Sequence, residues 1–253
     1  MHPILFNIGP VEIRAYGVLT ALAFLTAIYL ASALVKKEHM DPDIIFDLGL
    51  VVILASVVGA RLLYVMVWWK YFSAHPLEIF KIWEGGLVFY GGLIGGFIGG
   101  IAWVKYKKLP VFKVADMCVP FIALAHAIGR IGCWFNACCY GAVNEQYGVI
   151  FTALGDNLKH YPTQLYESAL NFLNFLVLIL FFKNKKRKNG DVLFLYSINY
   201  GVIRMIVEIF RGDPERGTVL FMSTSQFISV FLIAIGIAGF VYLRLKKETE
   251  KHG

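Results

Sequence analysis

Charged residues are scarce in this sequence, and their scarcity excludes most soluble folds. Only 16% of the 253 residues are Asp, Glu, Lys or Arg, whereas 58% are hydrophobic. A soluble domain has about 25% charged and about 45–50% apolar residues. So few charges cannot provide a wetted surface for a chain of this length. The composition therefore predicts an integral membrane protein.

The alternating polar and apolar pattern of a membrane β-barrel is also missing. Long apolar runs are present instead, each near the length of about 20 residues that a helix needs to cross a bilayer. Helices are favoured because lipid cannot solvate unpaired backbone groups. We expect an all-α, polytopic membrane protein with one transmembrane domain over residues 1–253. Its seven expected spans are residues 16–35, 44–68, 87–104, 114–135, 166–182, 191–210 and 224–243.

Basic residues gather after alternate spans. Of the 24 Lys and Arg residues, 15 follow the first, third, fifth and seventh spans. Positive loops remain in the cytoplasm, so the N-terminus is predicted outside and the C-terminus inside, with residues 141–165 forming a small periplasmic cap. This topology accounts for the net charge of +7 without nucleic acid as a partner. The clusters are Lys36 and Lys37; Lys105, Lys107, Lys108 and Lys113; Lys183, Lys185, Lys186, Arg187 and Lys188; and Arg244, Lys246, Lys247 and Lys251.

Ionisable side chains inside the expected spans are candidate functional groups, because each is costly to bury in lipid. Arg61, Arg130 and Arg204 lie in the three spans that run outward, about 13 to 17 residues after each start, which at about 1.5 Å of rise per residue places them in the outer half of the membrane. Tyr16 and Tyr90 begin spans on that same side. A single arginine at this depth has the alternative of extending to the lipid headgroups. Several at one depth favour a shared site.

One carboxylate in the expected spans, Glu208, cannot neutralise three guanidiniums. Glu208 lies four residues after Arg204 on one helical face and is expected to pair with it. Arg211 follows at the end of the same span. The remaining guanidiniums need an anion, and they match phosphate oxygens in a bidentate way that lysine does not. We expect a phosphate-binding cavity that opens to the outer leaflet.

Small residues predict close helix packing rather than chemistry. "GGLIGGFIGG" at residues 91–100 places glycines four apart, which lets neighbouring backbones approach. The four cysteines, Cys118, Cys133, Cys138 and Cys139, fit a four-ligand zinc site poorly by spacing. A disulfide and a nucleophilic thiol stay open, but small packing residues are favoured. No metal and no cofactor are expected.

Six motifs in order resemble the prolipoprotein diacylglyceryl transferase family. They are "RAYGVL" (14–19), "GARLLYV" (59–65), "WEGGLVFYGGLIGG" (83–96), "HAIGRIGCWFNACCYG" (126–141), "YPTQLYE" (161–167) and "YGVIRMIVEIFR" (200–211). The third of these holds the packing glycines, and the fourth resembles the family signature built on G-R-x-G. The resemblance covers nearly the whole chain.

This resemblance implies an enzyme that transfers the diacylglyceryl group of phosphatidylglycerol to the lipobox cysteine of a prolipoprotein and releases glycerol 1-phosphate. The implied location is the bacterial cytoplasmic (inner) membrane, with the active site toward the outer leaflet, membrane lipids as neighbours and a monomer as the working state. Catalytic roles fall on Arg130, Arg204, Glu208 and Tyr90. Substrate-binding roles fall on Tyr16, Arg61, Asn136, Gly141, Gln164, Tyr200 and Arg211, with Glu167 beside Gln164 in the cavity wall.

Departures from the family pattern leave the proton acceptor and two alternative functions open. Tyr90 stands where some members have a histidine proposed as the base, and a tyrosine of pKa about 10 is a poor base at neutral pH. Glu208, His126 and His160 are the other candidates. The alternatives are a divergent paralogue and a transporter or flippase for an anionic phospholipid. A transporter would be expected to show inverted repeats and charge near the midplane.

Overall fold

The computed structural model describes residues 3–8, 11–186, 188–211, 218–219 and 222–245, and it contains two compact units. The first unit comprises residues 1–30 and 115–253, and the second comprises residues 31–114. Of the expected basic clusters, Arg187, Lys246, Lys247 and Lys251 lie outside the described residues.

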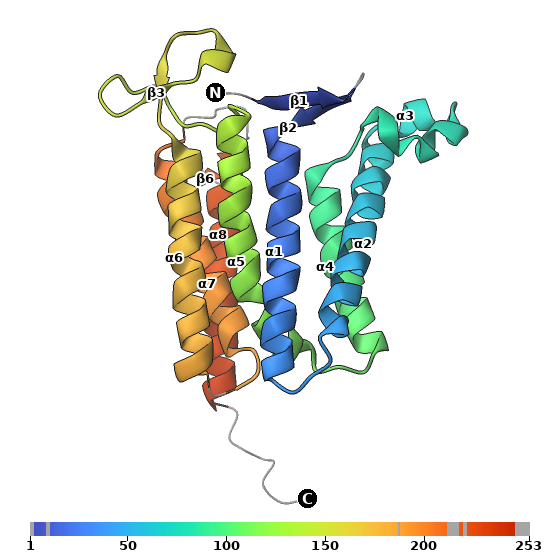
Figure 1. The fold of residues 1–253 in the computed structure, drawn as a ribbon, viewed down its shortest axis with the longest axis vertical. Helices are drawn as coiled ribbons and strands as arrows, with labels where there is room; N and C mark the ends of the chain where they lie inside the picture. The colour runs from blue at the N-terminus through green and yellow to red at the C-terminus, as the bar shows by residue number, and fades with distance from the viewer. Residues whose placement is uncertain (1–2, 9–10, 187, 212–217, 220–221, 246–253) are drawn as a thin grey trace, which may run out of the picture. The chain divides into compact units, whose positions relative to one another are not determined.

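Long helices build the first unit. Figure 1 shows α5, α6, α7 and α8 running side by side, and buried side chains join them within this unit. Tyr16 at the start of α1 lies against Gly132 of α5, where an added Cβ would be 3.3 Å from the tyrosine ring. The helices are α1 (Ala15–Lys37, which continues into the second unit), α5 (Val111–Phe135), α6 (Thr163–Asn184), α7 (Asp191–Ile209) and α8 (Thr224–Leu245).

The second unit contains two long helices and a short connecting region. Gly85 and Gly86 lie between the 3₁₀ turn η2 (Ile82–Glu84) and helix α4 (Phe89–Tyr106). Both adopt positive φ angles, which favour glycine. The chain therefore turns sharply before it enters α4. The elements are α2 (Asp43–Val67), α3 (Trp69–Phe72), the 3₁₀ turns η1 (Pro76–Phe80) and η2 (Ile82–Glu84), and α4 (Phe89–Tyr106).

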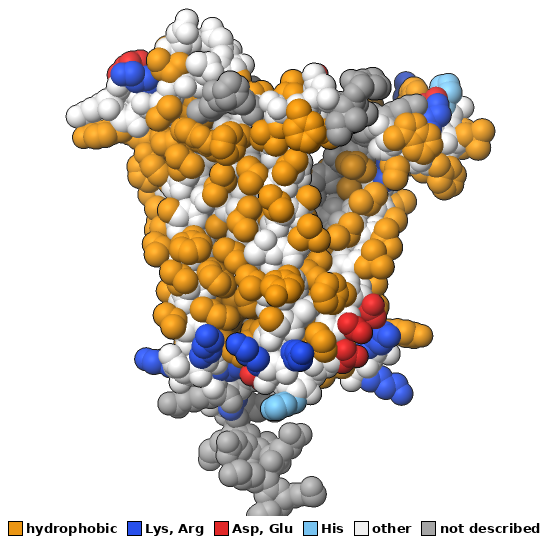
Figure 2. Space-filling model, viewed as in Figure 1, with side chains coloured by type: hydrophobic (Ala, Val, Ile, Leu, Met, Phe, Trp, Pro, Cys, Tyr) orange, Lys and Arg blue, Asp and Glu red, His pale blue; other side chains and the backbone are white. Residues whose placement is uncertain are grey.

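Six helices of the described chain are long and apolar enough to cross a membrane: α1, α2, α5, α6, α7 and α8. Helix α4 covers the remaining expected span, but at 18 residues it is shorter than those six helices. Figure 2 shows hydrophobic side chains along the sides of the helices, with Lys and Arg gathered at helix ends. This distribution is what lipid contact requires, and the expected polytopic helical membrane architecture is confirmed to that extent.

Within the described residues, three short antiparallel strand pairs accompany the helices, and the sequence does not predict them. None of these strands is longer than five residues. Strands this short give little periodic signal in a single sequence. The pairs are β1 (Ile4–Ile8) with β2 (Val11–Arg14), β3 (Val149–Ile150) with β4 (Lys159–His160), and β5 (Thr218–Val219) with β6 (Met222–Ser223).

Glycines bring α2 and α4 into backbone contact, which confirms the packing role expected for "GGLIGGFIGG". A Cβ added to Gly59 would collide with the carbonyl oxygen of Gly91 and would lie 2.9 Å from the Cα of Gly95. A Cβ on Gly95 would collide with the carbonyl oxygen of Ala55. Backbone atoms cannot rotate away from such contacts, so these positions require glycine.

Gly59→Val should therefore destabilise the protein, by about 1–3 kcal/mol as overpacked substitutions usually do. The measurement is the free energy of unfolding in a detergent titration. Gly17→Val is the matched control, because no atom lies within 4 Å of a Cβ at Gly17. Equal stability of the two variants would contradict close packing of α2 on α4.

A buried carboxylate fixes the start of α7 in the first unit. Asp116 of α5 is fully buried and accepts hydrogen bonds from the backbone N–H groups of Gly190, Val192 and Leu193 at 2.7, 3.1 and 2.9 Å. An anion at a helix N-terminus satisfies unpaired N–H groups and complements the helix dipole. Asp116 thus ties α7 to α5 at the end opposite Arg130.

Candidate active site

Glu167 is the centre of a buried charge network in the first unit. Its side chain extends from the first turns of α6 and is fully buried. Arg130 of α5 donates from Nη2 to Glu167 Oε1 at 3.0 Å, and Arg204 of α7 donates from Nη1 to Oε2 at 3.2 Å. One carboxylate therefore joins two guanidiniums that come from different helices.

Each guanidinium has a further partner. Arg204 Nη2 donates to Glu208 Oε2 at 3.1 Å and to Ser225 Oγ of α8 at 3.0 Å. This ion pair within α7 confirms the pairing expected from the four-residue spacing. Arg130 Nε donates to His126 Nε2 at 3.3 Å, and the same ring nitrogen lies 3.3 Å from Glu167 Oε1. The network thus spans α5, α6, α7 and α8.

Glu167 has a more central place in the structure than the sequence predicts. The family resemblance places Glu167 in the cavity wall beside Gln164. The structure begins α6 at Thr163 and buries Glu167 completely. The same cost of burying charge that singles out Arg204 applies to Glu167 and could have found it. With Glu208, it balances the charges of Arg130 and Arg204.

The start of α6 holds the loop that follows α5. Gln164 is fully buried, and its Nε2 donates to the carbonyl oxygen of Cys138 at 2.7 Å. Thr163 Oγ1 donates to the carbonyl oxygen of Cys139 at 2.9 Å. Because Glu167 is one turn further along the same helix, these bonds fix the loop relative to the charge network.

Gly141 closes this loop where there is no room for a side chain. Its N–H donates to the Tyr161 carbonyl oxygen at 2.9 Å. A Cβ at this position would collide with the carbonyl oxygen of Phe210 and would lie 2.8 Å from the methyl group of Thr163. The structure gives Gly141 a packing role at the end of α7, which accounts for glycine at the close of the signature.

The segment expected to form a cap, residues 141–165, carries β3, β4 and a 3₁₀ turn, η3 (Thr152–Leu154). His160 is buried, and its ring nitrogens lie 3.1 Å from the Gly141 carbonyl oxygen and 2.9 Å from Asp156 Oδ2. The hydrogen bond to His160 lowers the pKa of Asp156. His160 is thus held in the structure of this segment by two partners.

Three other expected site residues lie in the first unit. Tyr200 of α7 has its ring 5.5 Å from that of His126 and therefore borders the charge network. Tyr16 is 43% exposed and lies over Gly132, two residues after Arg130. Asn136 is half-buried, and its side chain lies near the Cys138 thiol.

Arg211 lies two residues after the end of α7 and is half-buried. Its backbone N–H donates to the Glu208 carbonyl oxygen at 3.1 Å. Its positive charge acts on Cys139, as that of Arg130 also does. The loop after α5 therefore lies in the field of two guanidiniums.

Arg61 lies in the second unit and is enclosed by backbone. Its guanidinium donates to the carbonyl oxygens of Ile79 and Gly85 at 2.9 Å, of Gly86 at 3.2 Å, and of Glu78. Four carbonyl partners satisfy most of the five N–H donors of an arginine. This arrangement shows that Arg61 orders the segment between α2 and α4.

Tyr90 also belongs to the second unit. It lies in the first turn of α4 with 53% of its surface exposed, and its ring packs against Phe89 with the centroids 5.8 Å apart. An exposed phenol of this kind is available to a ligand.

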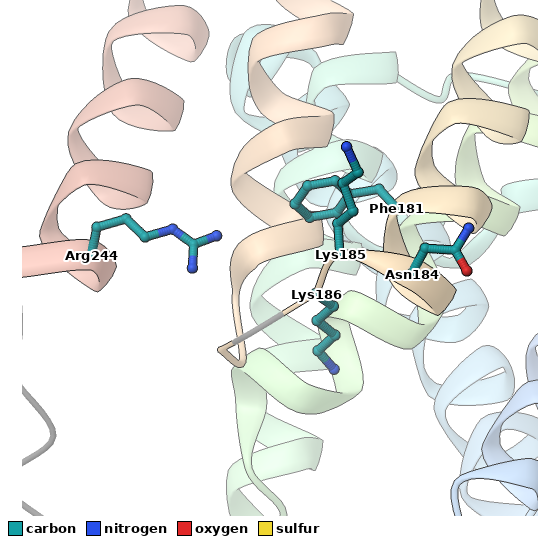
Figure 3. A pocket seen from close by; sticks show the side chains of 5 residues that line it. All are labelled: Phe181, Asn184, Lys185, Lys186 and Arg244. Atoms are coloured by element: carbon teal, nitrogen blue, oxygen red, sulfur yellow. The ribbon is translucent and has the colours of Figure 1, made fainter.

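A separate hollow of about 530 Å³ lies at the basic end of the first unit, where α6 and α8 end (Figure 3). Two of its cations are paired with buried acids: Lys186 lies 3.5 Å from Asp116, and Arg244 lies 3.1 Å from Asp191. These cations stabilise the start of α7. The hollow is distinct from the network around Glu167.

The long apolar helices with a buried network of two arginines and two glutamates define a polytopic membrane protein with a charged intramembrane site. The sequence matches the prolipoprotein diacylglyceryl transferase family over residues 3–242. It is 42% identical over 252 residues to the phosphatidylglycerol–prolipoprotein diacylglyceryl transferase of Clostridium tetani, covering 98% of this chain and 100% of that one.

Other relatives of that name agree. Identity is 36% with the protein of Streptococcus equi subsp. zooepidemicus, over 98% of this chain and 97% of the relative. It is 35% with that of Staphylococcus aureus, over 97% of this chain and 90% of the relative. The chain belongs to the prolipoprotein diacylglyceryl transferase family.

Proposed function

We propose that the protein transfers the diacylglyceryl group of phosphatidylglycerol to the lipobox cysteine thiol of prolipoproteins and releases glycerol 1-phosphate. The observation that carries this proposal is the pair of guanidiniums, from Arg130 and Arg204, held together by Glu167. The names of the relatives support the same reaction.

The chemistry requires positive charge at one oxygen. The substrate sulfur attacks the glycerol carbon that carries the phosphodiester, so a C–S bond forms as the C–O bond breaks. Both electrons of the C–O bond go to the departing phosphate, which gains negative charge. Guanidiniums at that oxygen stabilise the transition state more than the substrate, and such interactions accelerate a reaction.

The network leaves donors for this task. An arginine has five N–H donors, and hydrogen bonds to described residues use two on Arg130 and three on Arg204. Glu167 and Glu208 orient the two guanidiniums, and Ser225 fixes Arg204 further. The remaining N–H groups bind the phosphate oxygens. The carboxylates thereby act as positioning groups.

The other expected residues surround the lipid headgroup in this proposal. Tyr16, Tyr200 and Asn136 supply hydrogen bonds, and Arg211 adds positive charge. Gln164 and Gly141 act through the loop that they hold in place. In the second unit, Tyr90 offers an exposed phenol to a ligand, and Arg61 stabilises the segment before α4.

For topology we propose seven spans, with α4 as the third, the N-terminus outside and the C-terminus in the cytoplasm. The alternating basic clusters support this orientation. It directs the site toward the outer leaflet of the bacterial inner membrane. The protein then works as a monomer and as a single catalytic domain, with residues 141–165 as its periplasmic cap.

Purified protein in vesicles with phosphatidylglycerol and a lipobox peptide tests the function. We expect one glycerol 1-phosphate for each thioether-modified peptide. Movement of intact phosphatidylglycerol across the bilayer without either product would identify a flippase instead. Hydrolysis of the lipid, or transfer to a different acceptor, with no thioether formed would identify a divergent paralogue.

A further inference from the structure

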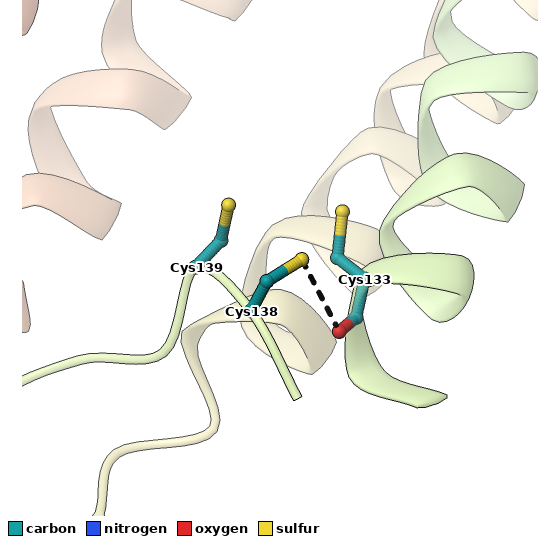
Figure 4. Close-up of side chains that lie close together, drawn as sticks. All are labelled: Cys133, Cys138 and Cys139. Carbon is teal, nitrogen blue, oxygen red and sulfur yellow. Dashed lines mark hydrogen bonds between the residues drawn. The ribbon is translucent and has the colours of Figure 1, made fainter. Parts of the chain in front are cut away.

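The structure gathers three cysteines that the sequence separates. Cys133 is in the last turn of α5, whereas Cys138 and Cys139 are in the loop beyond it, and their three sulfur atoms lie within 4.8 Å of one another. Figure 4 shows the sulfurs of Cys133 and Cys139 pointing to the same side. Packing alone does not require three sulfurs to converge.

The loop backbone creates this convergence. The chain folds back on α5, with the N–H of Cys138 donating to the Cys133 carbonyl oxygen at 3.1 Å. Ala137 and Cys139 both adopt positive φ angles, of 50° and 63°, which cost free energy in residues other than glycine. Gln164 and Thr163 then hold the carbonyl oxygens of Cys138 and Cys139. The sulfurs are thus positioned by bonds from another helix.

Three thiolates at this separation match a zinc ion. A tetrahedral zinc ion has Zn–S bonds of about 2.3 Å, which places its sulfur ligands about 3.8 Å apart. Sulfurs within 4.8 Å of one another reach that separation by small side-chain movements. Soft sulfur ligands in a tetrahedral arrangement select zinc over hard cations such as Mg²⁺ or Ca²⁺.

The ligand number also points to chemistry. Structural zinc sites have four protein ligands, whereas catalytic sites have three and keep a position for water or substrate. Cys118, the remaining cysteine, is 15 residues before Cys133 along α5 and is about 22 Å away at the rise of a helix. Cys138 and Cys139 are partly exposed, so the fourth position is accessible.

The surroundings suit the charge of such a complex. Zinc with three thiolates has a net charge of about −1. Arg130 and Arg211 act electrostatically on Cys139, and Arg130 acts on Cys133. These cations stabilise the complex beside the phosphate site.

We propose that Cys133, Cys138 and Cys139 bind Zn²⁺ with an open fourth position, and that the substrate cysteine thiol takes that position for transfer. This inference rests on the proposed function, and it supplies the thiolate that Tyr90 is poorly suited to generate. A thiol that coordinates a metal is deprotonated outright. Its proton passes to water.

The transfer step conserves atoms, electrons and charge. The zinc-bound substrate sulfur uses an electron pair to form the C–S bond to the glycerol carbon. The C–O bond breaks with its electrons moving to the phosphate beside Arg130 and Arg204. The product thioether is neutral and a weak ligand, so it leaves the zinc ion. No oxidant or reductant is needed.

Metal content of the purified full-length chain tests the site. We expect about one zinc per chain, and replacement by Co²⁺ should give the visible thiolate-to-cobalt absorption of a sulfur-ligated site. Cys139→Ser should lose this band and most of the metal. Cys118→Ser is the matched control and should keep both. Chains without zinc that also give no cobalt band would overturn the proposal, and so would titration showing two cysteines joined in a disulfide.

The cobalt spectrum of the unmutated protein needs no variant, so a Cys139→Ser chain that misfolds leaves the test intact. Adding lipobox peptide should shift the cobalt band, whereas a Cys→Ser peptide should not. A peptide thiol that leaves the spectrum unchanged would overturn the role of the fourth position. Full transfer by zinc-free protein would overturn the inference and leave the proposed function standing. Zinc binding without any transfer would overturn the proposed function and leave the metal site standing.

Discussion

Arg130→Lys should lower the turnover number for glycerol 1-phosphate release by about 10²–10³-fold, as loss of an oriented donor to a developing negative charge usually does. Lysine keeps the positive charge but loses the planar fork that binds a carboxylate and a phosphate together. Arg130 donates from two nitrogens of its guanidinium, Nε to His126 and Nη2 to Glu167. The measurement is the initial rate of transfer at saturating phosphatidylglycerol.

Arg14→Lys is the control for this change. Arg14 pairs with Glu12 at 3.0 Å on an exposed surface, with 61% of its side chain accessible, so the same substitution there should leave the rate unaltered. A turnover number for Arg130→Lys within a few fold of the unmutated protein would remove Arg130 from the reaction.

Glu167→Gln should cost about 3–5 kcal/mol of unfolding free energy, which is the usual result of removing one partner from a buried ion pair. Glu167 is fully buried, and within the described network its loss leaves Arg130 without a carboxylate partner and Arg204 with Glu208 alone. Transfer should fall as well, because the guanidiniums lose the group that holds them together. Detergent-titration unfolding and the transfer assay provide the two measurements.

A compensating change separates the two effects. Arg130→Gln added to Glu167→Gln removes one charge of each sign, so much of the lost stability should return while transfer stays low. Glu12→Gln is the exposed control and should alter neither quantity. Recovery of transfer in the doubly changed chain would contradict a direct role for Arg130.

The features predicted well from the sequence depend on local spacing. Arg204 and Glu208 are four residues apart on one helix, so their pairing follows from helical geometry. The glycine rows of residues 91–100 follow the same logic, and their close contact with α2 is found in the structure. The apolar runs also predict most of the helices, because burial in lipid depends on composition along the chain.

The features that sequence reasoning missed depend on contacts between distant segments. Glu167 joins Arg130, 37 residues earlier, to Arg204, 37 residues later, and no local spacing encodes that meeting. Arg61 has the same depth pattern as the other arginines, but carbonyl groups of residues 78–86 surround it. The cysteine cluster likewise depends on a reversal of the loop with positive φ at Ala137 and Cys139.

Binding of phosphatidylglycerol tests the central claim most directly, since the account assigns the lipid phosphate to Arg130 and Arg204. Native mass spectrometry should show the unmutated protein retaining phosphatidylglycerol in preference to uncharged diacylglycerol. The chain with Arg130→Gln and Glu167→Gln, which preserves net charge, should lose that preference. Equal retention of phosphatidylglycerol by both proteins would contradict the assignment.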